Sequence, residues 1–166
     1  MLISDDYRRL NRALHAEGSY GRKGDKWTAR VEQLIDRFRP VDILDYGCGQ
    51  GALGRALGRP IGEYDPAVQG KDAPPQPADL VVCTDVLEHV EPACLDTVLD
   101  DLQRLTRVCL FAVVSTRPAV KVLADGRNAH LIVEPWSFWE DRLSSRFTID
   151  DVLIHHKEVE VVLLPR

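Results

Sequence analysis

A short apolar run followed by a glycine-rich turn constrains the fold of this chain more than any other feature. Residues 41–45 read as a buried strand, glycines follow at positions 47, 49 and 51, and residues 52–57 fit the first turns of a helix. A strand, glycine turn and helix in this order are typical of a parallel α/β sheet, whose ligands bind beyond the carboxyl ends of the strands. The turn therefore predicts a ligand pocket beside the three glycines.

The rest of the chain alternates helical and strand-like patterns. Helices are predicted at 4–16, 26–38, 95–105 and 135–145, and further strands at 61–64, 79–83, 108–114, 147–155 and 157–164. Strands that alternate with helices and end in a strand pair predict a single α/β domain with a mostly parallel, doubly wound sheet and an antiparallel C-terminal edge. We expect residues 1–39 to form a helical lid and residues 40–166 to form the ligand-binding core.

A carboxylate two residues before the first glycine narrows the choice of cofactor. Gly47, Gly49 and Ala52 satisfy the loose dinucleotide pattern, so a nicotinamide or flavin cofactor has to be considered. Asp45 would lie near a pyrophosphate and repel it, whereas it can accept hydrogen bonds from the ammonium group of an amino-acid moiety. The position of Asp45 therefore argues against a dinucleotide.

Two segments carry a resemblance to a known family. VDILDYGCGQGALGRAL resembles the first motif of class I S-adenosylmethionine (SAM)-dependent methyltransferases, and DLVVCTDVLEHVEP resembles the fourth-strand motif of their ubiquinone-type branch, the type 11-like methyltransferases. The resemblance implies a Rossmann-like fold, SAM as cofactor and methyl transfer to an acceptor. The cofactor-binding residues that it implies are Asp45, Gly47, Cys48, Gly49, Gly51, Asp65, Asp72, Thr84 and Asp85.

In this family an acidic residue at the end of the second strand binds both ribose hydroxyls, and Asp65 matches that position, with Glu63 as the competing candidate. Asp72 is a weaker match to an acidic residue near the adenine. Only a short segment separates Asp65 from the strand at 79–83. We therefore expect the helix and strand that usually lie between them to be shortened or absent.

The methyl-transfer end is predicted from residues that follow the later strands. Asp85, His89 and His130 are the candidates for catalysis, because a carboxylate or an imidazole can remove a proton from the acceptor. The alternative interpretation is structural, with Asp85 and Glu88 forming a capping box and His89 packing in the core. The candidates for substrate binding are Tyr20, Arg117, Arg127, Asn128 and His130.

Asp85, Glu88, His89 and His130 could also supply ligands to a divalent metal, but our predicted site contains no metal. The net charge of −5 and the lack of a basic stripe favour a small molecule or a saccharide as the acceptor. A nucleic-acid methyltransferase, possibly assisted by a metal, and a SAM-binding protein without catalysis are the alternatives. The N-terminus lacks the apolar core of a signal peptide, and no apolar run approaches the roughly 18 residues of a membrane span, so we expect a cytoplasmic protein.

Overall fold

A computed structural model describes residues 1–16 and 24–166 and places a six-stranded sheet at the centre of the molecule. The strands are β1 (Ile43–Tyr46), β2 (Gly62–Tyr64), β3 (Ala78–Thr84), β4 (Thr106–Ser115), β5 (Phe147–Ile154) and β6 (Glu158–Pro165). The helices are α1 (Asp5–Ala16), α2 (Thr28–Phe38), α3 (Ala52–Leu57), α4 (Leu95–Leu105) and α5 (Trp136–Ser144), with short 3-10 turns η1 (Gly24–Trp27), η2 (Leu87–His89) and η3 (Pro92–Cys94). These elements confirm the predicted order of helices and strands.

The strand order is β2-β1-β3-β4-β6-β5. The strands β1 to β4 run parallel, whereas β6 pairs antiparallel with both β4 and β5. This arrangement confirms the predicted mostly parallel sheet with an antiparallel C-terminal edge. The connection from β2 to β3 contains neither helix nor strand, as the short spacing in the sequence predicted.

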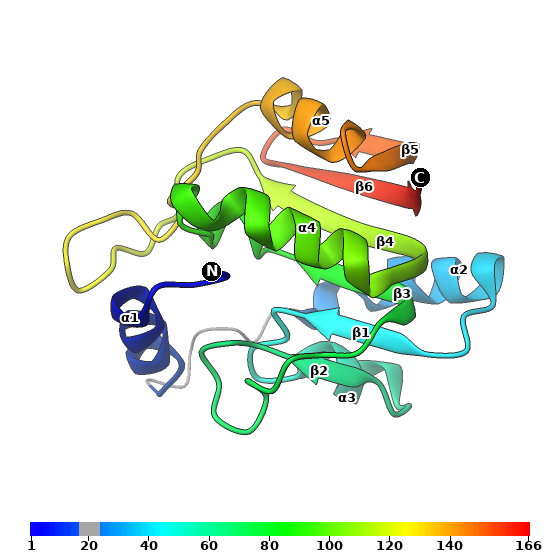
Figure 1. Cartoon of the computed structure of the whole chain (residues 1–166), viewed down its shortest axis with the longest axis horizontal. Helices are drawn as coiled ribbons and strands as arrows, with labels where there is room; N and C mark the ends of the chain where they lie inside the picture. Colours follow the sequence, from blue (N-terminus) through cyan, green and yellow to red (C-terminus); the bar gives the residue numbers. More distant parts are fainter. Residues whose placement is uncertain (17–23) are drawn as a thin grey trace.

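Apolar side chains cover both faces of the sheet, and alternate residues of β4 contribute to the two apolar layers, one on each face. Leu110 and Ala112 pack into the layer beneath α4 and α5, whereas Phe111 and Val113 pack into the layer beneath α2 and α3. All four side chains are fully buried. Figure 1 shows α4 in front of the sheet and α2 behind it. Burial on both faces explains why β4 reads as a continuous apolar run.

The outer strand β5 forms one edge of the sheet and carries two adjacent acidic residues, Asp150 and Asp151, at its middle. Its pairing with β6 is irregular between Ile149 and Asp151, where the register shifts. Arg37 binds Asp150 with both of its terminal nitrogens, and Arg30 Nη2 lies 2.6 Å from Asp151 Oδ2. The two arginines therefore tie α2 to the exposed edge.

The N-terminal helices occupy two different places. Tyr7 and Leu14 of α1 form a small apolar cluster with Leu123 and Ala129, so α1 lies against the segment that follows β4 (Figure 1). The helix α2 instead packs on the sheet. A lid was predicted over residues 1–39. Within this range α1 lies at the carboxyl ends of the strands, where a ligand is expected. The helix α2 is instead part of the packed layers, because its apolar stripe faces the strands. None of the described helices is both long and apolar enough to cross a membrane.

Candidate functional site

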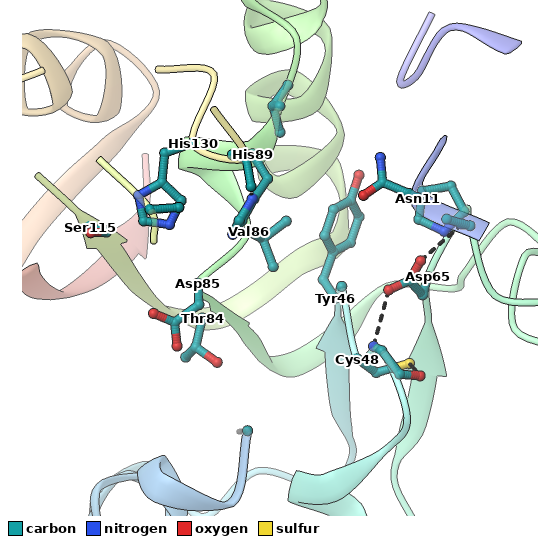
Figure 2. A pocket seen from close by; sticks show the side chains of 18 of the residues that line it. Asn11, Tyr46, Cys48, Asp65, Thr84, Asp85, Val86, His89, Ser115 and His130 are labelled. Carbon is teal, nitrogen blue, oxygen red and sulfur yellow. Dashed lines mark hydrogen bonds between the residues drawn. The ribbon is translucent and has the colours of Figure 1, made fainter. Parts of the chain in front are cut away.

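A cavity of about 500 Å³ opens at the carboxyl ends of β1, β3 and β4. Its size falls within the range of ligand pockets in proteins. The ends of these strands, the glycine turn, α1 and the segment after β4 all contribute to its lining. Figure 2 shows His89 and His130 at one end of the pocket and Asp65 with Asn11 at the other, so the cavity has two chemically different ends.

The glycine turn after β1 is stabilised by hydrogen bonds that its own backbone amides donate to the end of β2. The amides of Gly47 and Cys48 donate to the carbonyl oxygen of Tyr64, at 2.7 and 3.0 Å, and the amide of Gly49 donates to Asp65 Oδ2 at 3.0 Å. Gly47 has a φ of +79°, and a Cβ built on it would lie 2.3 Å from Cγ2 of Val86. Glycine is therefore required at position 47 both for the backbone conformation and for space.

The two predicted acidic ligands, Asp45 and Asp65, are buried side chains that line the pocket. Asp65 accepts hydrogen bonds from the amides of Gly49 and Ala67, which fix the orientation of its carboxylate. Burial, reinforced by the nearby Glu63, raises the pKa of Asp45 from 3.8 to about 7, although Lys71 opposes the shift. A buried carboxylate with a raised pKa favours a cationic ligand, because a positive charge would stabilise its ionised form.

The structure separates three other predicted positions from the pocket. Glu63 Oε2 lies 2.8 Å from Lys71 Nζ, and this ion pair sits against Gly51, where a Cβ would be 2.3 Å from Glu63 Oε1. Asp72 is exposed, with Oδ2 at 3.3 Å from Nη2 of Arg12. Glu63, Gly51 and Asp72 do not line the described cavity, whereas Asp65 does. The geometry therefore favours Asp65 over Glu63 as the ligand at the end of β2.

Thr84 and Asp85 line the middle of the pocket, and Asp85 adopts a φ of +56°. Its carboxylate accepts a hydrogen bond from Nε1 of Trp27 at 3.2 Å and pairs with Lys26 Nζ at 3.2 Å. Lys26 also pairs with Glu158 of β6 at 3.3 Å. The capping box predicted as the alternative role is wrong, since the N-cap position of η2 is Val86 and not Asp85, and Val86 makes no side-chain capping hydrogen bond. A non-glycine residue at positive φ beside a pocket is a frequent sign of function.

His89 and His130 meet at the other end of the pocket, with their ring centroids 4.7 Å apart. Burial, together with the neighbouring His130, lowers the pKa of His89 from 6.5 to about 4, so its imidazole is neutral at pH 7. The neighbouring Glu88 is fully buried, and burial raises the pKa of its carboxyl group to about 8. Ser115 N donates to Glu88 Oε1 at 3.0 Å.

The candidates for substrate binding divide into residues at the pocket and residues away from it. Arg117 lines the cavity, but Arg127 is exposed, pairs with Asp125 at 2.7 Å and lies 5.6 Å from the ring of Tyr7. Asn128 does not line the cavity; its amide group binds both the N–H and the carbonyl of Ala119. These contacts indicate that Asn128 stabilises the conformation of the segment between residues 119 and 128. Tyr20 lies outside the described residues.

Sequence reasoning predicted a helical lid over residues 1–39 but named none of the residues of α1 that reach the pocket. Tyr7, Asn11 and His15 line the cavity, and His15 Nε2 lies 3.9 Å from Asp65 Oδ2. The hydroxyl of Tyr7 donates to the carbonyl oxygen of His89 at 2.6 Å. The three residues are spaced four apart, so they share one helix face. Polar and aromatic side chains on that face, beside the apolar ones, were the signal that could have located them.

Comparison with solved structures identifies the fold as that of class I SAM-dependent methyltransferases. The chain resembles 1,6-didemethyltoxoflavin-N1-methyltransferase from Burkholderia thailandensis with a TM-score of 0.71 and 14% identity, over 96% of this chain and 89% of the other. That enzyme was solved with bound 1,6-didemethyltoxoflavin and S-adenosylhomocysteine (SAH). The fold class predicted from the sequence is thereby confirmed.

Two further structures show the same fold. Magnesium protoporphyrin IX methyltransferase from Synechocystis PCC 6803, solved with SAH, gives a TM-score of 0.60 and 15% identity, over 89% of this chain and 83% of the other. An rRNA methylase from Escherichia coli gives a TM-score of 0.53 and 15% identity, over 99% of this chain and 78% of the other. No family model matches the chain, and a comparison with curated proteins finds no match. The three named neighbours act on different kinds of acceptor, so the fold does not select one.

Replacing Gly47 with Ala tests the packing of the glycine turn. We expect Gly47→Ala to lower the free energy of unfolding by about 2–4 kcal/mol, because it combines a left-handed backbone with a Cβ 2.3 Å from Val86. Equilibrium unfolding in urea measures the change.

Gly58→Ala is the matched control, because Gly58 has a φ of +61° and open space around its Cβ position. This variant should lower the free energy of unfolding only by the cost of placing Ala in a left-handed backbone conformation, about 1–2 kcal/mol. The double variant Gly47→Ala/Val86→Ala removes the clash and should lose less stability than the two separate changes added together. If Gly47→Ala and Gly58→Ala lower the free energy of unfolding equally, the proposed steric role of Val86 is contradicted.

Proposed function

We propose that this protein is a SAM-dependent methyltransferase. The observation that carries the proposal is a pair of buried carboxylates, Asp45 and Asp65, at the ends of two neighbouring strands on either side of a glycine turn, in a pocket of the methyltransferase fold. A cofactor with cationic and hydroxyl groups suits this pair, whereas a pyrophosphate would be repelled by both carboxylates.

Asp65 suits the ribose of SAM. A carboxylate has about four lone-pair positions, and the amides of Gly49 and Ala67 use two of them. The remaining positions can accept hydrogen bonds from two neighbouring hydroxyl groups. Because the two amides already fix the carboxylate, little conformational entropy would be lost when the ribose binds.

Asp45 suits the ammonium group of the methionine end. Its pKa of about 7 reflects burial that nearby Lys71 offsets only in part, so the site as it stands favours an added positive charge. SAM supplies an electrophilic methyl group on a sulfonium, and the residues of this chain would have to align an acceptor with that methyl and take up its proton. Asp85 in the middle of the pocket and His89 and His130 at its far end are the residues that we assign to aligning the acceptor, and Asp85 is the one that would take up the proton.

A small molecule or a saccharide remains our proposed acceptor. The segment after β4 and α1 pack together through Tyr7, Leu14 and Leu123, and both line the pocket. A pocket lined by several separate segments of the chain suits a compact acceptor better than a folded nucleic acid. Arg117 and Lys121 line the same part of the pocket, so an acceptor that carries an anionic group would be favoured.

Asp65→Ala should weaken the binding of SAH by about 1.5–3 kcal/mol, the contribution of hydrogen bonds to a charged acceptor. Isothermal titration calorimetry with SAH measures the affinity. The variant should also be less stable, because the amides of Gly49 and Ala67 would lose their acceptor, so folding is checked by circular dichroism at the same temperature. Glu63→Ala is the control and should bind SAH normally; the reverse pattern would assign the ribose to Glu63.

The affinity for SAH should depend on pH through Asp45. The pKa of Asp45 is about 7 in the unliganded protein, and an ammonium group binds the ionised form, so the affinity should rise as the pH increases toward 7 and level off above it. Below pH 7 the slope should approach tenfold per pH unit, with a proton released on binding. Calorimetry in two buffers of different ionisation enthalpy measures that proton, and Asp45→Asn should abolish both effects. A proton release that persists in Asp45→Asn would assign the titration to another group.

The acceptor is sought with SAM labelled at its methyl group, incubated with the protein and a cell extract that is then separated into small-molecule, protein and nucleic-acid fractions. Label in the small-molecule fraction supports the proposal. Label in RNA or DNA would overturn the choice of acceptor while supporting methyl transfer. Binding of SAH without transfer to any fraction would favour a SAM-binding protein without catalysis.

A further inference from the structure

We propose that Glu88, His89 and His130 bind a single divalent transition metal ion at the floor of the pocket. One ligand atom from each residue lies within 4.8 Å of the other two. Ligands about 2.0–2.2 Å from a zinc ion stand roughly 3–3.5 Å apart, so small side-chain rotations would close the set around an ion. Binding of the metal is independent of the proposed function, whereas its role in methyl transfer rests on that function.

Glu88 provides the strongest support for a cation. Its side chain is fully buried, and Oε1 accepts the hydrogen bond from Ser115 N at 3.0 Å. Oε2 is shielded from solvent and has no hydrogen-bond partner among the residues that the structure describes. A buried carboxylate oxygen without a partner is energetically unfavourable, and a bound cation is one of the few groups that remove this penalty.

The two histidines are oriented by backbone carbonyl groups. His89 Nδ1 lies 2.7 Å from the carbonyl oxygen of Ala129, and His130 Nδ1 lies 2.6 Å from that of Arg117. A carbonyl oxygen can only accept, so Nδ1 of each ring carries a proton and Nε2 of the neutral ring carries the lone pair. Histidine ligands of metals are commonly held in this way, with the second ring nitrogen donating to a carbonyl or carboxylate.

The three side chains come from two segments that are fixed to each other, η2 with Glu88 and His89 and the loop with His130. The amide of Ile132 donates to the carbonyl oxygen of Glu88 at 3.0 Å, which ties the segment carrying His130 to η2. Asn128 accepts a hydrogen bond from the amide of His130 at 2.9 Å. The geometry of the cluster is therefore set by the backbone rather than by the side chains alone, as a preorganised metal site requires.

The chemistry of the set indicates which metals it would take. Two imidazole nitrogens and one carboxylate oxygen suit zinc, manganese, iron or cobalt, whereas magnesium and calcium prefer oxygen ligands alone. Three protein ligands leave at least one coordination position open. Because His89 and His130 line the cavity, that position faces the pocket, where an oxygen or nitrogen atom of the acceptor can coordinate. Coordination would lower the pKa of such an atom and assist loss of its proton.

Calorimetric titration of the full chain, first treated with a chelator and then dialysed, with zinc chloride tests the inference. We expect one zinc ion per chain, bound at least about 100-fold more tightly than magnesium. Glu88→Gln keeps the shape of the side chain and removes its ability to ionise on metal binding, and should weaken zinc binding by more than about 100-fold, since loss of outer residues alone weakens metal sites by about 10–100-fold. Cobalt(II) titrated in place of zinc should give visible absorption bands that the variant lacks.

His155→Asn is the matched control, because His155 Nε2 lies 2.7 Å from Glu160 Oε1 in another histidine–glutamate pair that lies outside the pocket. This variant should bind zinc as tightly as the unmodified chain. If Glu88→Gln does not fold, His130→Asn takes its place, because His130 lies on a loop and only part of its side chain is buried. Unchanged zinc affinity in the folded variant, or loss of zinc binding in His155→Asn, would overturn the inference.

Titration of SAH into the same samples separates this inference from the proposed function. Asp65 lies away from the histidine pair, at the other end of the pocket, so Glu88→Gln should bind SAH with unchanged affinity (Figure 2). Zinc binding without SAH binding would contradict the proposed function and leave the metal site in place. SAH binding without zinc binding would contradict the metal site alone.

Discussion

Three consecutive backbone amides, those of Gly47, Cys48 and Gly49, donate hydrogen bonds to Tyr64 and Asp65 where β2 ends, and the pocket depends on this contact. Because β1 and β2 are parallel neighbours, their carboxyl ends meet at one edge of the sheet, and the chain leaving β1 must turn across the end of β2. The same bonds that close the turn also orient the carboxylate of Asp65. One set of contacts therefore shapes the backbone and places a ligand-binding group, which explains why glycine turn and acidic residue occur together.

The parts of the fold that could be predicted from the sequence are those set by local periodicity. The strand β4 is buried on both faces and reads as an unbroken apolar run, and the apolar residues of α4 recur at helical spacing. The glycine turn could be located because positive φ strongly favours one residue type, as Gly47 shows. At the site, Asp45, Asp65, Asp85, His89 and His130 were predicted from the family resemblance and from their places at or after the ends of strands, and all of them line the pocket.

The remaining features depend on contacts between distant segments, which spacing alone does not reveal. Glu88 follows Asp85 at the interval of a capping box, yet its carboxylate accepts from Ser115, which lies 27 positions later in the chain. The helix α1 reaches the pocket only because Tyr7 and Leu14 pack on the segment after β4. No local pattern determines these pairings, so tertiary packing decided which polar residues face the cavity.

The irregular outer strand has a consequence for how copies of this protein behave toward one another. An unpaired strand edge can recruit the edge of a second molecule, and such pairing is a common route to aggregation. The edge formed by β2 is only three residues long, which offers few backbone groups for pairing. The longer edge at β5 combines a register shift with Asp150 and Asp151, both engaged by arginines of α2. A distorted, charged edge disfavours the addition of another strand, so both ends of the sheet resist polymerisation despite the exposed Ile154 at the tip of β5.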